Sequence, residues 1–195
     1  MASFYRNQLE RFLSELEINT DSLLDIGGSD LPITTRLKSC QTKRYVIIDT
    51  EKPQDENIEF YQVDLNYYRS AEDIFNGHRF KTIFCLEVFE YIWNPVFAMM
   101  NIYDWLEKGG TAYITFPWTY PLHNPIDIDY LRYTQQAIRK YLSVVFNKGF
   151  SEFEIIPRLM TEGREDYLNF ISKEKMHAAK VQNHAILGWI VIAKK

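Results

Sequence analysis

The chain of 195 residues lacks the features that mark several large protein classes. It has two cysteines, Cys40 and Cys85, which do not suggest a disulfide framework. No apolar run reaches the roughly 20 residues that a membrane-spanning helix needs, and the N-terminus lacks the apolar core of a signal peptide. We therefore expect a cytoplasmic protein, and the length favours a single domain over residues 1–195.

The motifs of several enzyme classes are also missing. The four histidines and two cysteines show no metal-ligand spacing, and no carboxylate cluster resembles a metal site. The chain has no Walker loop and no nucleophile elbow. Its net charge of −4, from 22 basic and 26 acidic residues, disfavours a nucleic-acid partner, which would favour a basic face. We expect no bound metal, and the sequence does not specify an oligomeric state.

Apolar runs and helical periodicity alternate along the chain. Short apolar runs predict strands, and apolar residues spaced three and four apart predict helices. This alternation is typical of an α/β protein with a parallel sheet and helices on both faces. We expect strands at residues 23–26, 44–48, 58–63, 80–86 and 111–116, and helices within 1–19, at 32–37 and 68–75, from Asn94 to the Gly109-Gly110 pair, and at 134–146.

Two further strands are expected at 153–156 and 186–193. No strong helix separates them, so we expect an antiparallel pair that closes the sheet. The polar segment 158–183 between them is interpreted as a lid or a surface insertion.

Acidic residues stand at the ends of three successive predicted strands. Asp25 precedes a turn of small residues at 27–29, Asp49 ends the second strand, and Asp64 follows the third. Each acid alone can serve to cap a loop. Together they mark the carboxyl ends of parallel strands, where open α/β sheets bind ligands. A carboxylate can accept bonds from both ribose hydroxyls, and glycines allow close backbone approach, so a nucleoside site is predicted.

The order of these motifs resembles class I S-adenosylmethionine-dependent methyltransferases over about residues 20–150. Asp25 and Gly27 match the family's first motif, and its later glycines fall on Ser29 and Leu31. The stretch 84–92, followed by Asn94-Pro95, 106–110 and 114–117, resembles the family's fourth and fifth strand region. Tyr91 stands where a histidine is common.

The resemblance implies a Rossmann-like fold, with seven mostly parallel strands, helices on both faces and an antiparallel last strand. It implies S-adenosylmethionine as the cofactor, with Asp49 on the ribose hydroxyls and Asp64 near the adenine amino group. The cofactor-binding residues that it implies are Asp25, Gly27, Gly28, Ser29, Asp49, Asp64, Leu65, Leu86 and Glu87.

The segment 121–134 resembles the stretch after the fifth strand in a subset of these enzymes. His123 is the first candidate for a general base, followed by Glu90 and Tyr91. Arg132 either pairs with a nearby aspartate or binds an anionic acceptor. The aromatic residues in the loops after the fourth and fifth strands either line an acceptor pocket or form a small satellite core; they are Trp93, Trp118, Tyr120, Tyr130 and Tyr133. The residues expected to bind the acceptor are Trp118, Tyr130 and Arg132.

The predicted function is therefore methyl transfer from S-adenosylmethionine to a small-molecule or glycan- or lipid-type acceptor, by in-line displacement. Two alternatives remain open. One is a methyltransferase-like protein that binds a partner without turnover. The other is a nicotinamide-dependent oxidoreductase, but the turn at Gly27 lacks the third glycine of that fingerprint.

Overall fold

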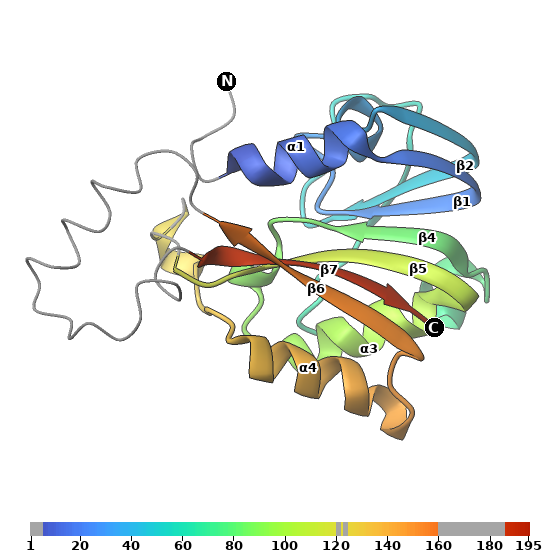
Figure 1. Cartoon of the computed structure of the whole chain (residues 1–195). Helices are drawn as coiled ribbons and strands as arrows, with labels where there is room; N and C mark the ends of the chain where they lie inside the picture. The colour runs from blue at the N-terminus through green and yellow to red at the C-terminus, as the bar shows by residue number, and fades with distance from the viewer. Residues whose placement is uncertain (1–5, 120–121, 123–124, 160–185) are drawn as a thin grey trace, which may run out of the picture.

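The computed structural model describes residues 6–119, 122, 125–159 and 186–195, and its seven strands form one sheet (Figure 1). The strand order is β3-β2-β1-β4-β5-β7-β6. Strand β7 runs antiparallel to both of its neighbours, and every other pairing is parallel, as the sequence predicted. The strands are β1 Glu17–Ile26, β2 Ser39–Asp49, β3 Glu59–Gln62, β4 Phe80–Cys85, β5 Leu106–Pro117, β6 Glu152–Leu159 and β7 Ile186–Lys194.

The α-helices lie on both faces of the sheet, and they are unequally shared (Figure 1). Helix α1, Asn7–Glu15, lies on one face. Helices α2, Ala71–Phe75, α3, Pro95–Trp105, and α4, Gln135–Val144, lie on the other. Single turns of 3-10 helix occur at Ile33–Thr35, Phe89–Tyr91, Ile126–Ile128 and Val145–Asn147.

The face that carries three helices has the larger core. Phe75 of α2 makes edge contacts with Phe80 and Trp105, with ring centroids 5.0 and 5.5 Å apart. Such edge-on aromatic pairs add to the free energy gained from burial alone. Ser70 caps the start of α2, and its side chain forms a capping box with Asp73.

The opposite face is covered mainly by α1. Only residues 27–38 separate β1 from β2, and this short crossover contains no more than the 3-10 turn Ile33–Thr35. Leu9 and Leu13 of α1 are fully buried beside Leu23, Ile33 and Phe84. Helix α1 thus supplies the cover that a longer crossover helix usually gives a parallel strand pair.

Several predicted boundaries were wrong for local reasons. The N-terminal helix expected within 1–19 spans Asn7–Glu15, because the chain is extended from Leu16 onward. Strand β1 starts six residues earlier than predicted, because residues 17–22 are polar except for Ile18 and do not form an apolar run. The 32–37 helix is a single 3-10 turn, and the helix expected at 68–75 starts only at Ala71.

Two errors fall later in the chain. The helix that begins at Pro95 ends at Trp105, and Gly109-Gly110 lie within β5. Residues 158 and 159 of the expected lid belong to β6, and the rest of that segment lies outside the described residues. Within the described ranges, no helix is long and apolar enough to cross a membrane. A single domain over 1–195 stays a prediction.

We predict that Leu13→Ala lowers the free energy of unfolding by about 2–5 kcal/mol, because it opens a cavity between α1 and the sheet. Urea denaturation would measure the change. Arg11→Ala on the same helix is the control, since the Arg11 side chain is 82% exposed. A loss for Leu13→Ala no larger than for the control would contradict the packing of α1.

Candidate functional site

The glycine turn after β1 is shaped by its backbone and by the acid beneath it. Gly27 has φ +78°, a left-handed conformation that favours glycine, and its amide donates to the Ile48 carbonyl at 2.8 Å. A Cβ on Gly28 would overlap the Asp25 carboxylate. The turn therefore lies directly on Asp25. Leu31, where the family's third glycine falls, is exposed.

Asp25 is buried, and the bonds it accepts lie inside the protein. Its Oδ2 accepts from the Ile33 amide and from the Tyr45 hydroxyl, both at 2.7 Å. Burial raises the pKa of Asp25 to about 6, although both hydrogen bonds lower it. These contacts connect the end of β1, the crossover and β2, so Asp25 positions the turn. Direct contact between Asp25 and a cofactor stays a prediction.

Asp49 lies at the end of β2 and faces the same turn. Its Oδ2 accepts from the Ser29 amide at 3.2 Å, and its Oδ1 accepts from the Thr50 amide at 2.7 Å. The Ser29 hydroxyl donates to the Glu51 carbonyl at 2.6 Å. Asp49 is only partly buried. Because a carboxylate offers about four acceptor positions, Asp49 keeps capacity for a ligand.

Asp64 and Asn66 organise the loop after β3. Asp64 is exposed, and its Oδ1 accepts from the amide and the side chain of Asn66, each at 2.9 Å. Asn66 in turn accepts from the amides of Trp93 and Asn94 at 2.9 and 3.0 Å. Asn66 therefore holds the loop after β4 against the loop after β3. The sequence analysis missed this role of Asn66, for which the only signal was its position two residues after Asp64.

The two predicted leucines have apolar surroundings. Leu65 belongs to the core under α2, α3 and α4, and Leu86 belongs to the core under α1. Both side chains are buried. They anchor the starts of the loops after β3 and β4 in the core. Contact with a cofactor stays a prediction for each.

Glu87 follows β4 in a left-handed conformation, φ +57°, which is uncommon outside glycine and is often found at functional sites. Its amide donates to the Thr115 hydroxyl at 2.7 Å, and its Oε1 lies 2.5 Å from Nη1 of Arg158. Burial opposes ionisation of Glu87. The Arg158 charge outweighs this opposition and holds the pKa of Glu87 below its ordinary value.

Arg158 is the main functional candidate that sequence reasoning missed. It lies in β6 and is only 1% exposed. The signal was a single arginine directly after the apolar run at 153–156, and it was assigned to the lid instead. An arginine so deeply buried requires a charged partner. The partner, Glu87, lies 71 residues earlier, so local pattern did not reveal it.

Glu90 lies three residues after Glu87, in the 3-10 turn Phe89–Tyr91. It is 4% exposed, and its Oε2 has no hydrogen-bond partner. Burial, and then the nearby charge of Glu87, raise the pKa of Glu90 to about 8. Its backbone carbonyl accepts from the Tyr130 amide at 2.7 Å, which brings the loop after β5 against it. Tyr91 is partly buried beside it in the same turn.

The predicted acceptor residues divide between surface and core. Tyr130 is exposed. Arg132 forms an ion pair with Asp129, with Nη2 2.8 Å from Oδ2. Of the two predicted roles for Arg132, this contact favours pairing with a nearby aspartate. Trp118 is partly buried against the core. His123 lies outside the described residues, so its role stays a prediction.

The aromatic residues of these loops divide between the two alternatives, because one is part of the core and another is exposed. Tyr133 is a core residue whose hydroxyl donates to the Phe89 carbonyl at 3.0 Å. Trp93 is exposed and makes an edge contact with Tyr67. Tyr120 lies outside the described residues. In the part of the chain that the structure describes, no group of three or more His, Cys, Asp and Glu residues could hold a metal ion.

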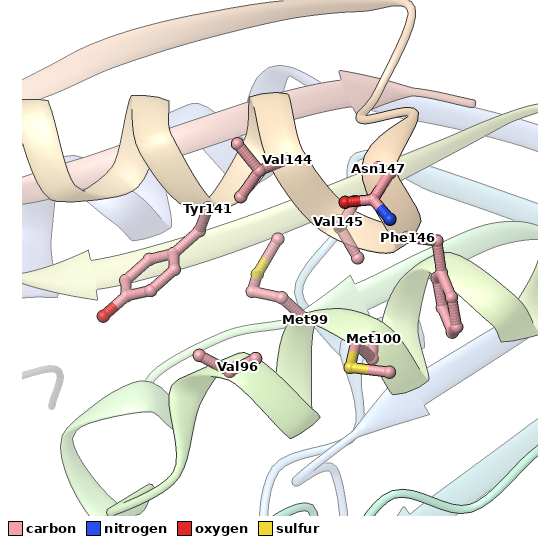
Figure 2. Close-up of a pocket in the computed structure, with 8 residues that line it drawn as sticks. All are labelled: Val96, Met99, Met100, Tyr141, Val144, Val145, Phe146 and Asn147. Carbon is pink, nitrogen blue, oxygen red and sulfur yellow. The ribbon is translucent and has the colours of Figure 1, made fainter.

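A cavity of about 310 Å³ lies between α3 and α4 (Figure 2). Figure 2 shows Met99 of α3 reaching toward α4. Its only ionisable lining group is the Tyr141 phenol, so the cavity offers little acid–base chemistry. It is lined by Val96, Met99, Met100, Tyr141, Val144, Val145, Phe146 and Asn147.

Comparison with known proteins identifies the domain family and the fold. A family model described as a methyltransferase domain matches residues 1–148. An S-adenosylmethionine-dependent methyltransferase from Mesorhizobium loti has a similar structure, with a TM-score of 0.63 and 10% identity over 98% of each chain. One from Archaeoglobus fulgidus has a TM-score of 0.62 and 12% identity, over 100% of this chain and 95% of the other. These likenesses concern the fold. A search of curated proteins found no match.

Asp25→Asn should change the pH dependence of stability. Folded Asp25 binds its proton more tightly than unfolded Asp25 does, so ionisation favours unfolding as pH rises from about 4 to 6. Asparagine keeps one acceptor oxygen and does not ionise. The free energy of unfolding of Asp25→Asn, relative to that of the wild type, should therefore rise by on the order of 3 kcal/mol between pH 4 and 7. Each unit of difference between the folded and unfolded pKa is worth about 1.4 kcal/mol.

Urea titrations at several pH values would measure this difference. Asp30→Asn, at an exposed position in the same turn, is the control and should show no such trend. Parallel pH profiles for Asp25→Asn and the wild type would contradict the burial effect.

Arg158→Met should destabilise the fold by about 3–5 kcal/mol, because it leaves the Glu87 charge without its partner. The double variant Glu87→Gln with Arg158→Met should regain most of that loss. Lys43→Met, which breaks the exposed pair with Asp21, should leave the stability nearly unchanged. Chemical denaturation of the four proteins tests the pair, and a double variant no better than Arg158→Met would refute it.

Proposed function

The chain belongs to the methyltransferase domain family and has the fold of S-adenosylmethionine-dependent methyltransferases, and from this premise we propose that it transfers a methyl group to a small-molecule or glycan- or lipid-type acceptor. S-adenosylmethionine is the cofactor that this family and fold imply. The observation that carries the proposal is the partly exposed Asp49 carboxylate, held at 3.2 Å from the Ser29 amide of a glycine turn.

The strand ends fit this cofactor chemically. Asp49 has acceptor capacity for the two ribose hydroxyls, and Asp64 has a free Oδ2 for the adenine amino group. The turn at Gly27 and Gly28 offers backbone without side chains to the methionine end. Asp25 supports that turn from beneath rather than from the ligand side.

The chain's part in the reaction is chiefly to hold two molecules in line. When bound, S-adenosylmethionine supplies a methyl group whose bonding electrons can leave with sulfur. The described parts of the loops after β3, β4 and β5 would set the relative position of the reactants. Positioning alone can supply roughly 7–11 kcal/mol of the barrier. Asn66 and the Glu90 carbonyl fix those loops to one another. Exposed Trp93 and Tyr130 offer aromatic surface to an acceptor.

Ligand-dependent stability tests the proposal directly. S-adenosylmethionine and S-adenosylhomocysteine, each at 100 times its dissociation constant, should stabilise the protein by about 2.7 kcal/mol. NAD should give no stabilisation at the same concentration. Absence of a shift with both sulfur nucleosides would sink the proposal, and a shift with NAD alone would favour an oxidoreductase.

Asp49→Ala should weaken S-adenosylhomocysteine binding at least tenfold, because each hydrogen bond to a charged acceptor is worth about 1.5–3 kcal/mol. Isothermal titration calorimetry would measure the change, and circular dichroism would verify the fold. Asp55→Ala, in the exposed loop after β2, is the matched control. Equal affinities for Asp49→Ala and the control would remove Asp49 from the cofactor site.

A further inference from the structure

Three carboxyl groups and two guanidinium groups gather where the loops after β4 and β5 meet β6. Glu87 pairs with Arg158, and Asp129 pairs with Arg132. Each arginine thus has its own carboxylate. Glu90 is the remaining acid, and it forms no ion pair with an arginine among the described residues.

Glu90 is held in place as firmly as its neighbours. Its carbonyl accepts from the amides of Tyr130 and Leu131 at 2.7 and 3.4 Å, and the Tyr91 amide donates to the Val88 carbonyl at 3.0 Å. The carboxyl is nevertheless 4% exposed, with no hydrogen-bond partner on Oε2. Burying a polar group without a partner costs free energy, and native proteins rarely keep one without a use for it.

Among the described residues around Glu90, each arginine already faces a carboxylate. Burial raises the pKa of the Cys85 thiol and of the Tyr133 hydroxyl, so both are neutral near pH 7. Glu87 and Asp129 add negative charge, and Arg158 adds the positive charge already shared with Glu87. Ionised Glu90 would give the described cluster one more negative than positive charge, and a cation beside Oε2 would balance that charge.

We propose that Glu90 binds the acceptor through its Oε2 and that the acceptor is a primary or secondary amine, which enters as its ammonium ion. This inference rests on the proposed methyl transfer and names its acceptor class. A neutral hydroxyl would satisfy the hydrogen bond but not the charge. Glu90 would then select amines over alcohols of the same shape.

The same carboxylate can prepare the amine for transfer. The ammonium gives one proton to Glu90 and becomes a neutral amine with a free lone pair. That lone pair forms the N–C bond as the methyl C–S bond breaks and its electrons pass to sulfur. The products are a methylated ammonium, a neutral thioether and a protonated Glu90, so charge and atoms balance. A proton acceptor works best when its pKa lies near the working pH, and that of Glu90 is about 8.

The cofactor carries cations of its own, so the test must separate the two roles. Isothermal titration calorimetry would first measure S-adenosylhomocysteine binding to the wild type, Glu90→Gln and Asp127→Asn. Asp127 is an exposed acid in the loop after β5 and serves as the matched control. Affinities within threefold of one another are expected. A tenfold loss in Glu90→Gln would place Glu90 on the cofactor and overturn the proposal.

The second measurement uses the protein saturated with S-adenosylhomocysteine. Benzylamine and ethanolamine are titrated as probes against benzyl alcohol and ethylene glycol. At least one amine should bind tenfold or more tightly than its alcohol, and that preference should vanish in Glu90→Gln and persist in Asp127→Asn. Two amines that bind no better than their alcohols, or an amine preference that survives in Glu90→Gln, would overturn the proposal.

Proton release gives a readout that needs no variant. At pH 7 the amine arrives charged and Glu90 arrives mostly protonated, so their ion pair should release about one proton per amine bound. Titrations in two buffers with different ionisation enthalpies would count it. No release in the wild type would contradict the ion pair. A wild type that binds neither sulfur nucleoside is a different failure, because it refutes the proposed function itself.

Discussion

The buried carboxylate of Asp25 is the contact on which the carboxyl ends of β1 and β2 depend. One oxygen accepts from the Ile33 amide and the Tyr45 hydroxyl, and Gly28 lies directly against the same group. The contacts join the end of β1, the crossover and β2. Because that crossover contains only one turn of 3-10 helix, its path follows this acceptor rather than the packing of a helix. The position of Asp49 opposite the turn depends on the same arrangement.

A second level of organisation joins the loops to one another. Asn66 ties the loop after β3 to the loop after β4, and the Glu90 carbonyl ties that loop to the one after β5. Arg158 brings in the edge strand β6 through Glu87. Four segments that are remote in sequence are therefore joined by hydrogen bonds, and one of these bonds is made by Glu87, which has a left-handed backbone. Strain of this kind persists only where surrounding contacts hold it in place.

Much of this architecture could be predicted, because its signals are local. The apolar runs that precede Asp25 and Asp49 predict buried parallel strands with acids at their ends, and the strand pattern predicts an antiparallel last strand. The polar first half of β1 was missed, since it is recognisable only by its pairing with β2. Arg158 was missed because its burial depends on a partner 71 residues away. The predicted end of α3 at Gly109 was wrong, because a glycine that can end a helix can also lie inside a strand, as Gly109 does in β5.

The place of β7 between β5 and β6 has a consequence for synthesis. Strand β6 contacts the sheet only through β7, which is the last of the seven strands to leave the ribosome. Until then, one side of β5 and the whole of β6 present unpaired backbone, and such edges promote association between chains. The nascent protein therefore has an open sheet until β7 emerges. A chaperone that shields strand edges would act on this intermediate rather than on the finished fold.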